Sequence, residues 1–217
     1  MTRLAVFDCD GTLVDSQANI VAAMHSTFVV VGIPAPAASA VRQLVGLSLA
    51  EIMAVLVPDG DEVLRRELVD TYRRTYHAMR SAGALAVEPL YPGIAGVLAA
   101  LEDDGWRLGI ATGKSDRGLA HLLAYHDIAH HFVTLQTADR HPSKPHPAML
   151  ELAMHQAGAL PGATVMIGDT GFDMAMAVAA GTRAIGVDWG YHTPDALRAS
   201  GADAVVGDSA ALLRAIA

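Results

Sequence analysis

The feature that most constrains the fold is an apolar run, residues 4–7, that ends in two carboxylates, Asp8 and Asp10, followed by Gly11 and Thr12. Four apolar residues are too few for a helix and predict a buried strand. Side chains two apart on an extended chain point to the same side, so Asp8 and Asp10 are expected to face one site. In an open α/β fold that site lies at the carboxyl edge of the sheet. Two carboxylates this close repel each other, which predicts a cation or a shared proton.

The rest of the chain divides into two kinds of sequence. Residues 17–83 carry helical patterns and no convincing strand, whereas the later part alternates helices with strands. The expected later strands are residues 107–111, 132–135, 164–167, 183–187 and 202–206. This alternation predicts an α/β fold, a parallel sheet wrapped by helices. We therefore expect a core domain of residues 1–15 and 85–217, and an inserted helical domain of residues 16–84. The insert is either a lid over a site or a fixed helical addition.

Composition and charge argue against several classes of protein. The chain has 217 residues, of which 52% are hydrophobic and 18% charged, as in globular proteins. A net charge of −8 argues against broad binding to nucleic acid or to anionic membranes. Asp8 and Asp10 interrupt the first apolar run, so we expect neither a signal peptide nor a membrane span. The single cysteine, Cys9, excludes an internal disulfide, and we expect a cytoplasmic protein.

Two further expected strands are followed by groups suited to binding phosphate. Thr112, Gly113 and Lys114 follow one strand, where the threonine hydroxyl and the backbone N–H groups of Gly113 and Lys114 could donate to phosphate oxygens. Lys144 precedes a proline, which holds it extended, and it could serve as a point charge for a phosphoryl group. Taken singly, each pattern also fits an ordinary surface turn.

A fourth strand end carries two more carboxylates. The apolar residues 165–167 lead into Asp169, and Asp173 follows at the opening of a helix. One of these could bind a metal directly while the other supports it from behind. Asp173 also fits an acidic residue placed favourably at a helix N-terminus. All four strand ends would meet at one edge of a parallel sheet, which favours a shared site.

The order of these residues resembles the four motifs of the haloacid dehalogenase-like (HAD) hydrolases, most of which are aspartate-dependent phosphohydrolases. The motifs are Asp8-x-Asp10-Gly11-Thr12, Thr112, Lys144 and Gly168-Asp169-x-x-x-Asp173. The helical segment after the first motif resembles the C1 cap of subfamily I. The overall texture, with Lys144-Pro145-His146-Pro147, is closest to phosphoglycolate phosphatase-like enzymes. The resemblance implies a HAD-like Rossmannoid sheet with helices on both faces and an inserted helical cap.

The resemblance also implies catalytic roles. Asp8 would be the nucleophile that forms an aspartyl-phosphate, and Asp10 would be the general acid and then the general base. Thr112 and Lys144 would hold and neutralise the phosphoryl oxygens.

The same resemblance implies one cofactor, Mg²⁺. Its ligands would be Asp8, the backbone carbonyl of Asp10, and Asp169, with Asp173 in support. Mg²⁺ prefers oxygen ligands and keeps several waters, so few side chains suffice.

Substrate choice is expected to depend on the inserted helical segment. The residues expected to bind substrate are Gly46, Leu47, Ser48, Thr112, Gly113 and Lys144, with Arg42 as a further candidate. The expected partner is a small phosphorylated metabolite, phosphoglycolate first, and the protein is expected to be a monomer or a homodimer.

Three alternatives stay open at this point. One is a sugar-phosphate mutase, whose cap loop typically carries an arginine soon after a glycine; no arginine follows Gly46 here. The second is an inorganic pyrophosphatase of the same family. The third is a non-catalytic protein that binds a phosphorylated ligand, although no residue of the four motifs is missing.

A group of histidines, His121, His126, His130 and His131, with His141 nearby, raises the idea of a second metal site. His121 and His126 are five residues apart, which is poor spacing for one helix face. We interpret the group as a polar helix face and loop.

Overall fold

Six parallel strands form the single sheet in the computed structural model, which describes residues 1–217. The strand order is β3-β2-β1-β4-β5-β6, so β1 lies in the middle and is hydrogen-bonded to β2 and β4. The strands are β1 Thr2–Phe7, β2 Arg107–Thr112, β3 Phe132–Thr137, β4 Ala159–Gly168, β5 Arg183–Val187 and β6 Ala204–Val206. The predicted α/β fold with a parallel sheet is confirmed.

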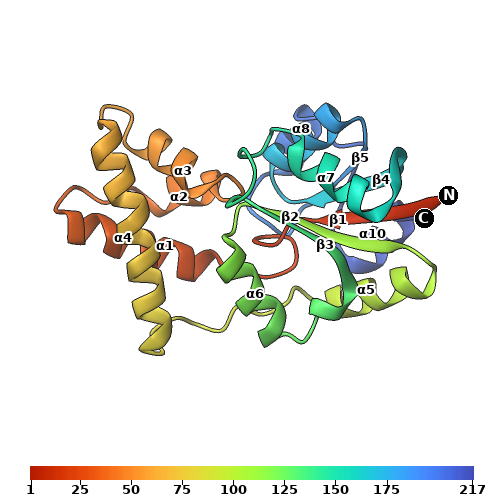
Figure 1. The fold of residues 1–217 in the computed structure, drawn as a ribbon, viewed down its shortest axis with the longest axis horizontal. Coiled ribbons are helices and arrows are strands. Elements are labelled where there is room, and N and C mark those ends of the chain that lie inside the picture. The colour runs from red at the N-terminus through yellow and green to blue at the C-terminus, as the bar shows by residue number, and fades with distance from the viewer.

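Helices cover both faces of the sheet. Successive residues of β1 contribute to different cores: Ala5 and Phe7 belong to one apolar cluster, and Leu4 and Val6 to the other. The first cluster packs against α5 (Ile94–Asp103), α6 (Asp116–Tyr125) and α10 (Ser209–Ile216). The second packs against α7 (Ala148–Ala157), α8 (Gly171–Ala180) and α9 (Pro194–Ala199). Figure 1 shows α7 and α8 above the sheet and α5 below it. A 3₁₀ turn, Ala129–His131, precedes β3.

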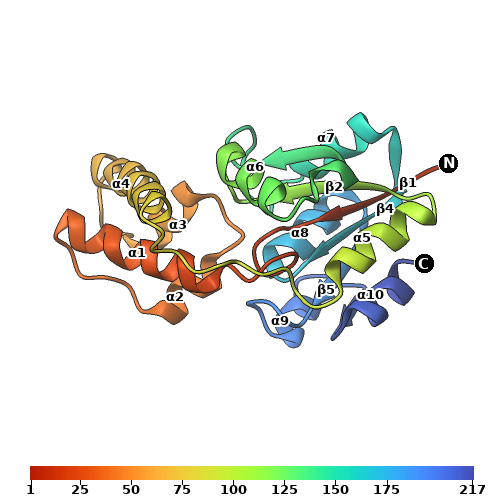
Figure 2. The ribbon, with the colours of Figure 1, turned by 90° about the horizontal axis from the view of Figure 1, so that it is seen from below.

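Four helices between β1 and α5 pack on one another beside the sheet, and we call residues 17–81 the cap. They are α1 (Gln17–Val31), α2 (Ala38–Leu44), α3 (Leu49–Leu56) and α4 (Glu62–Ser81). Their buried side chains, including Met24, Phe28, Met53 and Leu68, form an apolar cluster separate from the two around the sheet. Figure 2 shows the cap standing beyond one edge of the sheet. No helix of the chain combines the length and the apolarity needed to cross a membrane.

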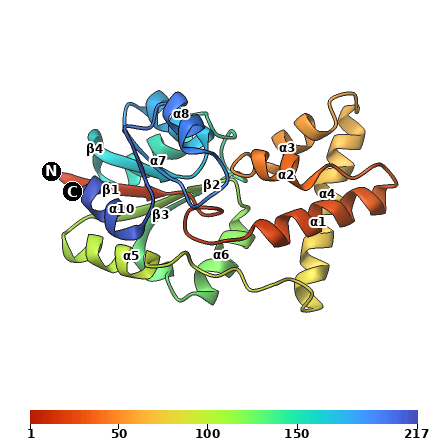
Figure 3. The same ribbon diagram turned by 180° about the vertical axis from the view of Figure 1, so that it is seen from behind.

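The two chain segments that join the cap to the sheet are hydrogen-bonded to each other. Asp15 N donates to the Pro89 carbonyl at 3.0 Å, and Tyr91 N donates to the Leu13 carbonyl at 2.9 Å. Figure 3 shows the two segments, in red and in yellow. The cap is therefore attached to the core through two neighbouring connecting segments.

Several strand ends differ from the prediction by one or two residues, and the start of β4 differs by five. β4 begins at Ala159 and not at residue 164, although Pro161 and Gly162 are typical of a loop. The pairing with β1 absorbs the extra residues, because the register shifts between Thr2, opposite Ala159, and Leu4, opposite Thr164. β6, the edge strand beside β5, is shorter than predicted and begins at Ala204.

Candidate active site

The candidate site lies at the carboxyl ends of the central strands, where the strand order changes direction along the chain. Asp8 directly follows β1, Thr112 is the last residue of β2, and Asp169 directly follows β4. The Asp8 N–H donates to the Ile167 carbonyl at 2.8 Å, which ties the first carboxylate to the neighbouring strand. Lys144 comes from the loop between β3 and α7. The sheet therefore brings the four predicted motifs to one edge.

The loop after Asp8 holds Asp169 in place. Gly11 has a φ of +87°, and a Cβ atom there would lie 2.1 Å from Asp169 Oδ2, so only glycine fits. The Thr12 hydroxyl donates to Asp169 Oδ1 at 2.9 Å, and the Tyr191 N–H donates to Asp169 Oδ2 at 2.9 Å. These two donors orient a carboxylate that is otherwise fully buried.

Three buried carboxylates form a candidate metal centre. One oxygen from each of Asp8, Asp169 and Asp173 lies within 4.8 Å of the others. Both carboxylate oxygens of Asp8 are buried; Oδ1 is paired with the Lys144 ammonium at 2.8 Å, and Oδ2 has no hydrogen-bond partner. Buried, unsatisfied oxygen donors fit a hard divalent cation. Burial raises the pKa of Asp8 to about 7 against the opposing charge of Lys144, and burial with the neighbouring Asp8 also raises the pKa of Asp169.

Lys144 is fully buried among these carboxylates. Its Nζ atom lies 2.8 Å from Asp8 Oδ1 and 2.7 Å from Asp173 Oδ1. Burial alone would lower the pKa of Lys144, but the two carboxylates outweigh it and hold the pKa above its usual range. Asp173 Oδ2 accepts from the Thr170 N–H and hydroxyl at 3.1 and 2.7 Å. Asp173 thus pairs with Lys144 and also accepts the hydrogen bonds of Thr170 at the start of α8.

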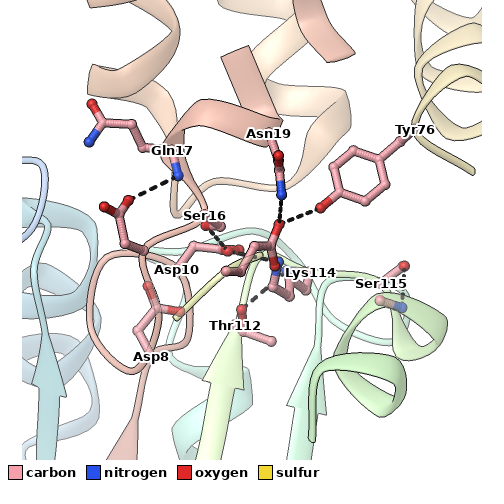
Figure 4. Close-up of polar contacts among 12 residues, drawn as sticks. Asp8, Asp10, Ser16, Gln17, Asn19, Tyr76, Thr112, Lys114 and Ser115 are labelled. Carbon is pink, nitrogen blue, oxygen red and sulfur yellow. Dashed lines mark hydrogen bonds and ion pairs between the residues drawn. The ribbon is translucent and has the colours of Figure 1, made fainter. Parts of the chain in front are cut away.

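Asp10 lies at the opening of the site beside the side chains of Ser16 and Lys114. The Ser16 hydroxyl donates to Asp10 Oδ1, and Lys114 Nζ lies 2.7 Å from the same oxygen (Figure 4). From the sequence, only the backbone N–H of Lys114 is expected to contribute to the site. In the structure that N–H donates to the Thr112 hydroxyl at 3.2 Å. One signal was available: Lys114 and Lys144 are the only two lysines of the chain.

A cavity of about 710 Å³ separates the cap from the sheet and opens onto Asp8, Asp10 and Thr112. Its wall includes the predicted loop residues Gly46, Leu47 and Ser48, whereas Arg42 does not line it.

This loop of the cap touches the core directly. A Cβ atom on Gly113 would lie 2.5 Å from the Leu47 carbonyl oxygen, and Ser48 N donates to Ser143 Oγ at 2.8 Å. The cap therefore lies closed over the site.

The predicted histidine group does not converge. His141 lines the large cavity, while His121 and His126 line a smaller one beside the segment that leaves the cap. His131 contacts Glu102, and no cluster of the group has metal-ligand geometry.

Comparisons with known proteins agree with the site. A family model described as haloacid dehalogenase-like hydrolase matches residues 5–187. The chain is 37% identical over 214 residues to a protein named probable phosphatase IndB from Dickeya dadantii, with 95% of this chain and 90% of the relative covered. It is 30% identical over 223 residues to the phosphoglycolate phosphatase of Vibrio vulnificus, with 97% and 94% covered.

Solved structures give the same result. The crystal structure of a predicted phosphatase from Clostridium acetobutylicum matches with a TM-score of 0.88 at 25% identity, covering 100% of this chain and 98% of that one. The fold, the four strand-end motifs and these relatives agree: the chain belongs to the haloacid dehalogenase-like hydrolases and is a phosphohydrolase.

Proposed function

We propose that the protein is a Mg²⁺-dependent phosphatase that hydrolyses a small phosphate monoester through an aspartyl-phosphate. The observation that carries this proposal is the state of Asp8. Its carboxylate lines the cavity and is paired through Oδ1 with the Lys144 ammonium at 2.8 Å, while Oδ2 is buried without a hydrogen-bond partner. An oxygen left without a partner in this way is available both to a cation and to phosphorus.

The carboxylate cluster fits the proposed cofactor. Asp8, Asp169 and the backbone carbonyl of Asp10 would hold Mg²⁺, with Asp173 in support. When bound, the ion would neutralise charge on the transferring phosphoryl group. Lys144 opposes the rise in the pKa of Asp8 and so favours the ionised nucleophile near neutral pH.

The protein's own residues account for both halves of the reaction. An Asp8 oxygen attacks phosphorus, the bond from phosphorus to the ester oxygen breaks, and Asp10 gives its proton to the departing alcohol. Water then attacks the aspartyl-phosphate while Asp10 takes a proton from it, which releases phosphate and restores the Asp8 carboxylate. Thr112 and Lys144 bind the phosphoryl oxygens throughout, so that charge is stabilised by groups already in place.

The proposal extends to domains, location and substrate. Residues 16–84 would form a cap domain over a core of residues 1–15 and 85–217. The thiol of Cys9 is buried and unpaired, which supports a reducing, cytoplasmic location. The phosphorylated metabolite to test first is phosphoglycolate, because the relative from Vibrio vulnificus carries that name.

The test is phosphate release from phosphoglycolate, several sugar phosphates and pyrophosphate, each with Mg²⁺ and with EDTA. We expect release that needs the metal and disappears in Asp8→Asn. Asp59→Asn, which changes an exposed aspartate in a turn of the cap, is the matched control and should keep full activity. Unchanged release by Asp8→Asn would refute the mechanism, and a phosphorylated isomer detected by ³¹P NMR would identify a mutase instead.

A further inference from the structure

Helix α4 of the cap faces helix α6 of the core across a positively charged contact. Arg117 Nη2 of α6 lies 3.1 Å from His77 Nδ1 of α4. One turn further along both helices, Arg80 of α4 and His121 of α6 line the same smaller cavity, and burial together with Arg80 lowers the pKa of His121. We call these four residues the basic seam. Both the cap helix α4 and the core helix α6 contribute one arginine and one histidine to it.

The arginines of the basic seam have no carboxylate partner. Neither Arg80 nor Arg117 forms an ion pair, although Arg73, one turn before His77, pairs with Asp139 at 3.4 Å. The Arg80 guanidinium instead lies over the Tyr76 ring, 5.0 Å from its centroid.

The carboxylate that acts on His121 of the basic seam is Glu88, and it is already engaged. Its Oε1 atom accepts from Asn19 Nδ2 at 2.9 Å and from the Tyr76 hydroxyl at 2.7 Å. Two arginines that line one cavity without a carboxylate partner repel, and an anion between them would remove that repulsion. Both arginines line a cavity that reaches Asp8, so an anionic occupant of that cavity would give them the partner that they lack.

The basic seam and the candidate site share one cavity. Arg80, Arg117 and His77 line the same 710 Å³ space as Asp8 and Asp10. Between the two ends lie Lys114, beside Asp10, and Tyr76, whose pKa is raised by burial against the opposing charge of Lys114. Figure 4 shows Tyr76 reaching down from the cap toward the side of the site that holds Lys114. From Tyr76 to Arg80 the helix axis adds about 6 Å. An occupant that reaches both ends is longer than a two-carbon ester.

We propose that the substrate carries a second anionic group, a carboxylate or a phosphate, at the end remote from the phosphate that is cleaved, and that Arg80 and Arg117 bind it together. The inference rests on the proposed phosphatase function and adds the class of substrate. Guanidinium groups suit both anions because they offer paired N–H donors to two oxygens. One arginine comes from the cap and the other from the core, so the remote anion also holds the cap closed on the substrate.

The test compares open-chain six-carbon esters that differ only at the remote end. These are glucitol 6-phosphate (neutral end), 6-phosphogluconate (carboxylate) and glucitol 1,6-bisphosphate (phosphate). Phosphoglycolate and 2-hydroxyethyl phosphate form the short pair. The value of kcat/KM is measured for the wild type, for Arg80→Gln and Arg117→Gln, and for the double variant. Arg66→Gln is the matched control, since Arg66 is an exposed α4 arginine paired with Glu62 outside the cavity.

We expect the wild type to favour an anionic remote end over the neutral one by about tenfold or more among the six-carbon esters, and less in the short pair. Each seam variant should remove most of this preference while the neutral ester keeps its kcat/KM within about twofold. The double variant should lose less than the product of the single losses, because both arginines hold one group. Arg66→Gln should keep the wild-type preference.

Two results overturn the inference while leaving the phosphatase proposal intact. One is a wild-type enzyme that cleaves neutral and anionic esters equally well. The other is a seam variant that lowers kcat/KM for both kinds by the same factor, as a merely structural role would. Absence of Asp8-dependent release from every ester, the neutral ones included, overturns the proposed function and this inference with it. Whether the carboxylate or the phosphate ester reacts faster identifies the anion.

Discussion

Replacing Lys144 by methionine tests the charge balance of the site. The substitution keeps the length of the side chain and removes the one cation among three buried carboxylates. The ammonium lies 2.8 Å from Asp8 and 2.7 Å from Asp173, and the side chain is 0% exposed. No solvent can take over its role without opening the core.

The expected loss in the free energy of unfolding, in the absence of metal, is about 3–5 kcal/mol, the range seen when one partner of a buried ion pair is removed. This is a large share of the roughly 5–15 kcal/mol that stabilises a typical domain. The loss should depend on pH. Lys144 opposes the rise in the pKa of Asp8, so Asp8 of the variant is protonated more readily in acid. Less unpaired negative charge then remains in the core, and the loss in the free energy of unfolding is smaller in acid than at alkaline pH.

Urea unfolding of metal-free protein, followed by circular dichroism at about pH 5.5 and about pH 8.5, measures both effects. Arg66→Met is the control that removes an exposed cation paired with Glu62, and it should cost at most about 1 kcal/mol at either pH. A loss below about 1 kcal/mol for Lys144→Met at alkaline pH would contradict the reasoning, because the carboxylates would then be stabilised without the lysine.

Two further predictions concern the cap and the metal. Gly113→Ala places a Cβ atom 2.5 Å from the Leu47 carbonyl oxygen, so the cap loop must shift; steady-state kinetics should show kcat/KM reduced on the order of 10²-fold. The free energy of unfolding measured in urea should change by no more than about 1 kcal/mol. Gly96→Ala is the control, because a Cβ atom there meets no atom within 4 Å, and it should keep its activity. Equal activity of the two variants would show that close contact between the cap loop and Gly113 is not required. Burial raises the pKa of Asp8 from 3.8 to about 7, so this group stabilises the metal-free fold in acid and the contribution is lost as pH rises through about 7. Mg²⁺ takes the place of the proton, so the rise in Tm on adding Mg²⁺ should be greater at about pH 8 than at about pH 5.5, and the opposite order would count against Asp8 as a ligand.

The strand ends could be predicted from the sequence because each combines an apolar run with an abrupt change to polar groups. Asp8 and Asp169 follow such runs, and the parallel sheet then leaves only one edge where both can lie. The start of β4 was not predictable in the same way. Pro161 and Gly162 oppose a strand locally, and the pairing of Ala159 with Thr2 depends on a partner far away in the chain.

Which charged side chains line the cavity could not be predicted from the sequence. The pattern of residues 61–82 predicts a helix, but many of its positions are charged, and the pattern does not say which face turns to α6. Arg80 and Arg117 come together only because the cap packs on the core in one orientation. Lys114 shows the same limit on a smaller scale: its backbone position follows from the strand, while its contact with Asp10 depends on the loop before α1.

The position of β1 in the sheet has a consequence for how the protein is made. This strand precedes all the others in the chain, yet it lies between β2 and β4, and its partner residues end only at Ile167. On the ribosome, its buried residues must wait without a partner while the whole cap emerges and folds around its own apolar cluster. The long separation of these contacts makes sheet formation the slow step. We therefore expect the cap to be complete before the sheet exists, with Asp8 among the last residues to reach its final surroundings.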